Sequence, residues 1–118
     1  MDKLQRYQQI IKEVLTHYHS MGPVDPNHIE RREMRLLFDD THARYQVLRL
    51  GWRGIKSFFT VIFHFEIIDE KIWLQHHATD YDIVEDLEIK GVPKEEIVLA
   101  FLAPEAWQHS GYAAPAYP

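Results

Sequence analysis

The sequence predicts an α+β fold, with an N-terminal helix, a four-stranded antiparallel meander, a second helix and a final strand. Three observations support this prediction. Apolar residues near the N-terminus recur at helical spacing. The middle of the chain is rich in aromatic and β-branched residues, which short turn segments interrupt. A further helical pattern then ends at a Gly-Val-Pro segment, as helices commonly do.

The first helix is predicted over residues 3–19. Its apolar residues form one stripe: Leu4, Tyr7, Ile11, Val14, Leu15 and Tyr18. Asp2 and Gln5 have the spacing of a capping box. The segment 21–27 contains one glycine and two prolines, and it is expected to end the helix.

Four strands are predicted next, over residues 33–38, 43–50, 55–68 and 72–77. Turns are expected at 39–42, at the glycines of 51–54, and at 69–71. The strand 55–68 carries apolar residues on both alternating faces. One face holds Phe59, Val61, Phe63, Phe65 and Ile67, and the other holds Phe58, Thr60, Ile62, His64, Glu66 and Ile68. We therefore expect the second face to be partly covered, by the C-terminus of the chain or by another subunit.

The second helix is predicted over residues 80–90, with Thr79 as its N-cap and Asp80 and Asp82 in its first turn. Gly91 is expected to end this helix, and Pro93 follows it. A short helical turn and a last strand over 97–102 complete a single domain, 1–118. Its aromatic, proline-containing tail, 103–118, is not expected to fold alone.

The composition limits the possible functions. The 118 residues are 46% hydrophobic and 26% charged, which is typical of a globular chain. The absence of cysteine excludes disulfides, thiolate nucleophiles and zinc–sulfur sites. The N-terminus does not resemble a signal peptide, and no apolar run approaches the length of a membrane span. We expect a cytoplasmic protein that needs no cofactor.

The charge is unevenly distributed along a chain whose net charge is −5. Residues 31–56 carry seven Lys or Arg and three acids, a net charge of +4, whereas residues 66–96 carry three Lys and ten acids, a net charge of −7. The basic segment 31–56 could contact nucleic-acid phosphates. The alternative, which we favour, is that these arginines solvate an edge or pair with the acidic region, within the chain or across a dimer.

The stretch IWLQHHATDYD (72–82) contains candidate metal ligands. His76 and His77 are expected on opposite faces of a strand, so a single ion cannot readily bind both. Asp80 and Asp82 are explained by the start of a helix. We therefore predict no metal site here. The chain also lacks a G-x-S-x-G motif and a phosphate-binding glycine loop, so we predict that it is not an enzyme, with a small hydrolase as a third reading.

Three segments carry a family resemblance: LFDDTHARYQVLRLGWRG (37–54), KIWLQHHATD (71–80) and GVPKEEIVLAF (91–101). In order and spacing they resemble the XisI family, named as the fdxN element excision controlling factor. The residues that carry the match are Asp39, Tyr45, Gln46, Gly51, Trp52, Gly54, Trp73, Gln75, Thr79, Gly91 and Pro93. Members commonly have aspartate in place of His77, which further disfavours a shared metal site.

The resemblance implies an accessory role in the programmed excision of a DNA element, in cyanobacteria that differentiate nitrogen-fixing heterocysts. There a separate site-specific recombinase cuts and joins the DNA, and XisI proteins are typically encoded beside XisH, which is similar to endonuclease folds. We therefore expect a regulator that binds an XisH-like partner, as an excision controller or an antitoxin-like inhibitor, and a homo-oligomer is a further expectation. The alternative is a DNA-binding accessory factor of recombination that uses residues 31–56. The candidate protein interface comprises Phe58, Ile62, Glu85, Asp86, Glu88, Trp107 and Tyr112.

Overall fold

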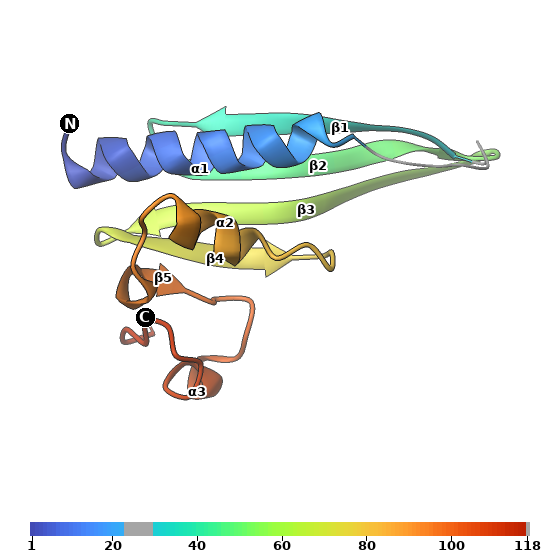
Figure 1. The fold of residues 1–118 in the computed structure, drawn as a ribbon. Helices are drawn as coiled ribbons and strands as arrows, with labels where there is room; N and C mark the ends of the chain where they lie inside the picture. Colours follow the sequence, from blue (N-terminus) through green and yellow to red (C-terminus); the bar gives the residue numbers. More distant parts are fainter. Residues whose placement is uncertain (23–29, 118) are drawn as a thin grey trace.

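The computed structural model describes residues 1–22 and 30–117, so most of the predicted helix-ending segment 21–27 lies outside the described residues. The elements in chain order are α1 (Lys3–Ser20), β1 (Glu30–Asp39), β2 (Arg44–Arg53), β3 (Lys56–Ile68), β4 (Lys71–His77), α2 (Ile83–Ile89), η1 (Lys94–Glu96), β5 (Ile97–Val98) and α3 (Pro104–Trp107). The sheet order is β1-β2-β3-β4-β5; the pairs from β1 to β4 are antiparallel, and β5 pairs with β4 in parallel. The predicted α+β fold is confirmed. Figure 1 shows α1 and α2 on one face of the sheet, which we call the helix side; the opposite face is the back face.

The first helix matches its prediction and is one residue longer. The capping box is present, because the Asp2 side chain accepts a 2.7 Å hydrogen bond from the Gln5 backbone N–H, and the Asp2 N–H donates to the Gln5 side chain. The buried residues of the helix are Tyr7, Ile10, Ile11, Val14 and Leu15. This stripe packs the helix against the sheet, which accounts for its stability better than intrinsic propensity does.

The meander is confirmed, but its second turn lies further along the chain than predicted. Gly51 lies within β2, and Arg53 pairs directly with Lys56, so the reversal is made by Gly54 and Ile55 alone. Gly54 has a φ of +63°, a conformation that glycine adopts without the steric cost of a side chain. β2 therefore extends past the predicted end at residue 50, whereas β3 begins one residue later than the predicted 55–68.

The alternation predicted for β3 is wrong at one position. Val47 pairs with Phe63 and Leu48 pairs with Val61, so Ile62 is an extra residue, a β-bulge. The bulge reverses the alternation. Phe63 and Phe65 face the helix side and are fully buried, whereas Phe59 and Val61 face the back. The apolar side chains of β3 near the turn, Phe59 and Val61, therefore belong to the back face, and those after the bulge, Phe63 and Phe65, belong to the core on the helix side.

The second helix begins later than predicted. Its N-cap is Asp82, whose side chain accepts a hydrogen bond from the Glu85 N–H, and neither Thr79 nor Asp80 caps it. The reason is that the Tyr81 carbonyl lies 2.8 Å from Nε2 of His77 and accepts from the Ile83 N–H, so it does not serve as a helical acceptor for the Glu85 N–H. The predicted end is confirmed, since Gly91, with a φ of +99°, follows the last helical turn.

The last strand is shorter than the predicted 97–102. The ladder with β4 is formed by Ile97 and Val98, and the chain then turns, with the Leu102 N–H donating to the Leu99 carbonyl. The Phe101 N–H still donates to the Leu74 carbonyl of β4. The tail that follows packs on the back face of β4 and β5. Trp107 meets Trp73 edge-to-face at 5.4 Å between ring centroids, and the Trp107 indole N–H donates to the Leu102 carbonyl. The chain's own C-terminus therefore covers this part of the second face.

Candidate functional site

Three strands extend past the C-terminal end of α1 and form a projecting arm (Figure 1). We define the arm as residues 32–34 of β1 and residues 48–61, which run along β2, through the turn and along β3. Neither α1 nor the C-terminal tail covers it in Figure 1. Ile55, at the turn, is 99% exposed. The two faces of the sheet differ in character along the arm.

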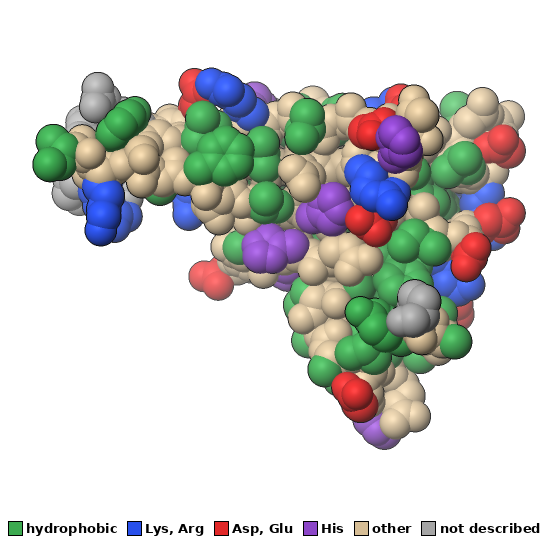
Figure 2. Space-filling model, turned by 180° about the vertical axis from the view of Figure 1, so that it is seen from behind, with side chains coloured by type: hydrophobic (Ala, Val, Ile, Leu, Met, Phe, Trp, Pro, Cys, Tyr) green, Lys and Arg blue, Asp and Glu red, His purple; other side chains and the backbone are tan. Residues whose placement is uncertain are grey.

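The back face of the sheet carries an exposed apolar surface that includes the arm. We call it the back patch and define it by Leu37, Leu48, Leu50, Trp52, Phe59 and Val61. Cross-strand pairing brings these residues together, because Leu48 lies opposite Val61 and Leu50 lies opposite Phe59. Leu37, Trp52 and Phe59 are 55%, 46% and 68% exposed. Figure 2 shows hydrophobic side chains along the projecting part of this face.

A polar network borders the back patch. His64 makes a 2.8 Å hydrogen bond with the Gln46 amide on one ring nitrogen and a 2.9 Å contact with the Glu66 carboxylate on the other. Arg44 lies 3.2 Å from the same carboxylate, and Gln75 donates to it at 3.4 Å. These side chains come from three adjacent strands and satisfy one another. The network therefore fixes the polar rim of the patch rather than presenting a free base or nucleophile.

A groove of about 410 Å³ lies between this network and the tail. Glu66, Trp73, Gln75 and Tyr117 are among the residues that line it. The Trp73 indole N–H is buried and has no hydrogen-bond partner among the described residues. The groove is continuous with the polar rim, since Glu66 and Gln75 belong to both.

The arginines of the basic segment divide into two groups. Arg44 pairs with Glu66 of the acidic region, as expected, whereas Arg35 pairs with Glu33 within the basic segment itself. Arg49 and Lys56, in contrast, have no ion pair with any residue in the described ranges 1–22 and 30–117. They lie on the helix side of the arm.

The family-motif residues occupy separate structural positions. Asp39 accepts a hydrogen bond from the His42 N–H in the first turn, and its contact with the His42 ring lowers the pKa of the Asp39 carboxyl. Tyr45 is buried, and its hydroxyl donates to Asp40 at 2.6 Å. Burial, followed by this hydrogen bond, raises the pKa of Tyr45.

The remaining motif residues are spread over the molecule. Gln46 and Gln75 lie in the polar network, and Gly51, Trp52 and Gly54 lie in the arm. Trp73 contacts the tail, Thr79 lies in the connection before α2, and Gly91 and Pro93 lie between α2 and η1. The motif therefore does not converge on one reactive centre, and most of its members shape turns, the arm and the core.

The residues predicted for a protein interface also separate. Ile62 and Trp107 are only 3% and 2% exposed, so in this conformation they offer no surface to a partner; the bulge and the folded tail bury them. Phe58 is half-buried on the helix side of the arm.

The acidic candidates lie on or beside α2. Glu85 is exposed, while Asp86 accepts a 2.6 Å hydrogen bond from the Tyr81 hydroxyl. Glu88 accepts one from the Tyr112 hydroxyl at 3.0 Å. The hydrogen bond to Asp86, more than burial, raises the pKa of Tyr81 to about 12. These contacts hold two of the three carboxylates in place.

The adjacent histidines lie as their alternation predicts. The His77 ring stacks on Phe63 at 5.3 Å, and its Nε2 lies 2.8 Å from the Tyr81 carbonyl. His76 is exposed and pairs across the sheet with His64 on the back face. In the part of the chain that the structure describes, no three His, Cys, Asp or Glu side chains are placed to hold a metal ion.

The back patch was not predicted from the sequence. Its signal is a change of phase within β2: Tyr45 and Val47 are apolar at odd positions, and Leu48, Leu50 and Trp52 are apolar at even positions. Such a change indicates that the start of the strand is packed through one face, and that its later apolar residues lie on the opposite face.

Among the described residues, no helix is long and apolar enough to cross a membrane.

The fold and its surfaces define a small α+β protein with a five-stranded sheet, a projecting arm and an apolar contact surface framed by polar side chains. The model of the XisI protein family matches residues 1–114. The chain therefore belongs to the XisI family.

Two solved structures support the assignment. A XisI-like protein from Anabaena variabilis is 37% identical, with a TM-score of 0.85 over 95% of this chain and 99% of that one. The fdxN element excision controlling factor XisI from the same organism is 27% identical, with a TM-score of 0.82 over 97% of this chain and all of that one. No curated protein matches the chain.

Proposed function

We propose that this protein is a non-catalytic control factor of DNA element excision, and that it acts by binding an XisH-like, endonuclease-fold protein through the back patch. Membership of the XisI family supports the general role, since one solved relative is described as an fdxN element excision controlling factor. The resemblance to the family supplies the class of partner. The back patch supplies the surface.

The observation that carries the proposal is the exposure of Leu37, Trp52 and Phe59 on one face. A soluble monomer rarely leaves a large contiguous apolar surface uncovered, and such surfaces commonly mark interaction sites. Aromatic residues at the centre with a polar rim are typical of protein interfaces. Here the rim is formed by the His64 network and by the Arg35–Glu33 ion pair.

A second contact is proposed at the acidic face of α2, which carries Glu85, Asp86 and Glu88. The positively charged cleft of a nuclease would attract such a face and orient the encounter. The hydrogen bonds from Tyr81 and Tyr112 hold two of the three carboxylates in fixed directions. Replacing all three with lysine should abolish pairing if this contact is used.

The test is co-expression with the XisH-like protein encoded beside this one, followed by measurement of the mass of the co-purified complex by light scattering. The variant Trp52→Ser/Phe59→Ser should lose the complex. Leu4→Ser is the control, because Leu4 is 44% exposed and lies on α1, away from the patch. Melting temperatures show whether both variants are folded.

Two results would overturn the proposal. One is a complex that forms equally well with wild type and with the patch variant. The other is a wild-type protein that self-associates through the patch and becomes monomeric in the variant, while the partner still binds. In that case the patch joins two copies of this chain.

A further inference from the structure

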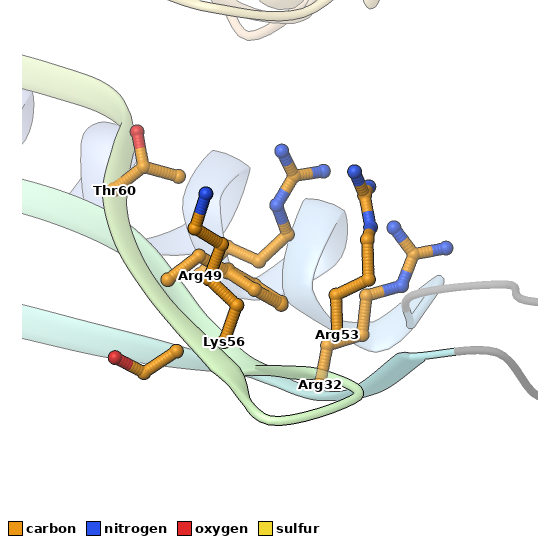
Figure 3. Close-up of a pocket in the computed structure, with 7 residues that line it drawn as sticks. Arg32, Arg49, Arg53, Lys56 and Thr60 are labelled. Carbon is orange, nitrogen blue, oxygen red and sulfur yellow. The ribbon is translucent and has the colours of Figure 1, made fainter.

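The helix side of the arm contains a pocket of about 260 Å³ that the back patch does not share. Its lining includes four cationic side chains from three strands, Arg32, Arg49, Arg53 and Lys56, together with the residues Ser57, Phe58 and Thr60 of β3. Figure 3 shows the labelled arginines and Lys56 extending to the same side of the strands. Among the residues that the structure describes, no acidic side chain lines the pocket.

Strand pairing explains why these residues meet. Arg32 lies opposite Gly51, which lies opposite Phe58, and Arg53 lies opposite Lys56. Gly51 has no side chain, so it contributes none to the middle of this cross-strand row. The bulge at Ile62 adds the aromatic and hydroxyl groups, because it brings Phe58 and Thr60 to the side on which Arg49 projects.

The charge of the pocket is incompletely balanced. The Arg49 Nε is buried and has no hydrogen-bond partner within the ranges 1–22 and 30–117. Neither Arg49 nor Lys56 forms an ion pair with the described part of the chain. Arg32 and Arg53 make other contacts, so the unbalanced charge is that of Arg49 and Lys56. A buried guanidinium donor without an acceptor is unfavourable, and a bound anion would supply the acceptor.

We propose that this pocket binds a phosphate group, carried either by a DNA backbone or by a free nucleotide. The arginine fork matches the oxygens of a phosphate, and the hydroxyl of Thr60 is an additional donor. Phe58 provides an aromatic surface for the adjoining sugar or base. The volume is just below the usual range of ligand pockets, about 300–1,000 Å³, which suits a single phosphate group. The pocket and the back patch lie on opposite faces of the arm, so phosphate binding goes beyond the partner binding proposed for the back patch.

Fluorescence anisotropy with a short labelled DNA duplex at low ionic strength tests whether the pocket binds the phosphates of a DNA backbone. The variant Arg49→Gln/Lys56→Gln should bind at least about tenfold more weakly, and the slope of its salt dependence should fall by nearly one unit for each phosphate that it no longer neutralises. Lys90→Gln/Lys94→Gln removes the same charge near α2 and is the control. Lys56→Gln alone changes an exposed residue, so it separates weakened binding from misfolding.

Calorimetry with a deoxynucleoside monophosphate and with pyrophosphate tests whether the pocket binds the phosphate of a free nucleotide. Binding of DNA with no response to the mononucleotide assigns the phosphate to a nucleic-acid backbone, and the reverse result assigns it to a free nucleotide. Binding of both, each weakened in the pocket variant, shows that the pocket recognises the phosphate itself. The proposal is overturned if neither binds. It is also overturned if the control variant weakens binding as much as the pocket variant does, because the effect would then be one of overall charge.

Discussion

The Tyr7 hydroxyl donates a 2.6 Å hydrogen bond to Oε1 of Glu96, which lies 89 residues further along the chain. Tyr7 is fully buried in the second turn of α1, and Glu96 is the last residue of η1, immediately before β5. Lys3 approaches the same carboxylate at 2.8 Å. The start of the first helix is thereby joined to the segment that leads into the final strand.

Replacing Tyr7 with phenylalanine should lower the free energy of unfolding by about 1–3 kcal/mol, because the hydrogen bond to a charged carboxylate is removed. Urea denaturation measures this change. Tyr18→Phe is the matched control, since the structure shows no hydrogen bond from that hydroxyl to the described residues; it should change stability by less than about 0.5 kcal/mol. Equal effects of the two substitutions would show that the hydrogen bond to Glu96 contributes nothing.

The same hydrogen bond predicts a decrease in stability at high pH. Burial and the hydrogen bond to Glu96 raise the pKa of Tyr7 from its usual 10.0 to about 12. The folded state therefore favours the protonated phenol, and this stabilisation is complete below pH 10 and is lost as the pH rises through about 12. Urea midpoints measured across this range should fall less steeply for Tyr7→Phe. Part of the slope should remain, because the pKa of Tyr81 is also raised to about 12.

The packing of the tail predicts a large effect of truncating Trp107. The residue is buried against Trp73, and alanine would leave a cavity, so Trp107→Ala should cost about 3–5 kcal/mol of unfolding free energy. His109→Ala, at an exposed position in the same segment, should remain within about 0.5 kcal/mol of wild type. Thermal unfolding followed by tryptophan fluorescence measures both. A small effect at Trp107 would mean that the tail does not contribute to the folded core.

Replacing Gly54 in the turn of the arm should lower stability through the backbone conformation alone, without a steric clash. Gly54 has a φ of +63°, and a Cβ placed there would meet nothing within 4 Å. Gly54→Ala should therefore cost about 1–2 kcal/mol from the left-handed conformation alone. Gly54→Asn should cost less, because asparagine tolerates this conformation. Chemical denaturation of the pair distinguishes conformation from crowding; equal costs would contradict the assignment.

The sequence predicted those elements whose signals are local. The capping box at Asp2, the stripe of α1 and the stop at Gly91 depend on neighbouring residues. The cap and the stop are confirmed, and the stripe is confirmed from Tyr7 to Leu15, whereas its predicted first member, Leu4, is exposed. The predicted start of α2 was wrong because the Tyr81 carbonyl is bonded to the His77 ring of β4, a contact between strand and connection that helical spacing does not specify.

The surfaces were less predictable than the elements. The excess of arginine in residues 31–56 was visible in the sequence, but its division between ion pairs on the back face and the pocket on the helix side depends on cross-strand register. The burial of Trp107 depends on where the tail packs. The register between strands and the packing of the C-terminal tail on the sheet are long-range properties, and alternation in a single strand does not specify them.

The β-bulge at Ile62 determines which face of the sheet each preceding side chain of β3 points to. Deleting that residue would rotate every side chain of β3 that precedes it by half a turn, so that Phe59 would move to the side that Thr60 now occupies. Fully packed residues such as Phe63 and Phe65 would keep their places. A single-residue deletion would therefore exchange the apolar and cationic aspects of this strand without altering any other amino acid.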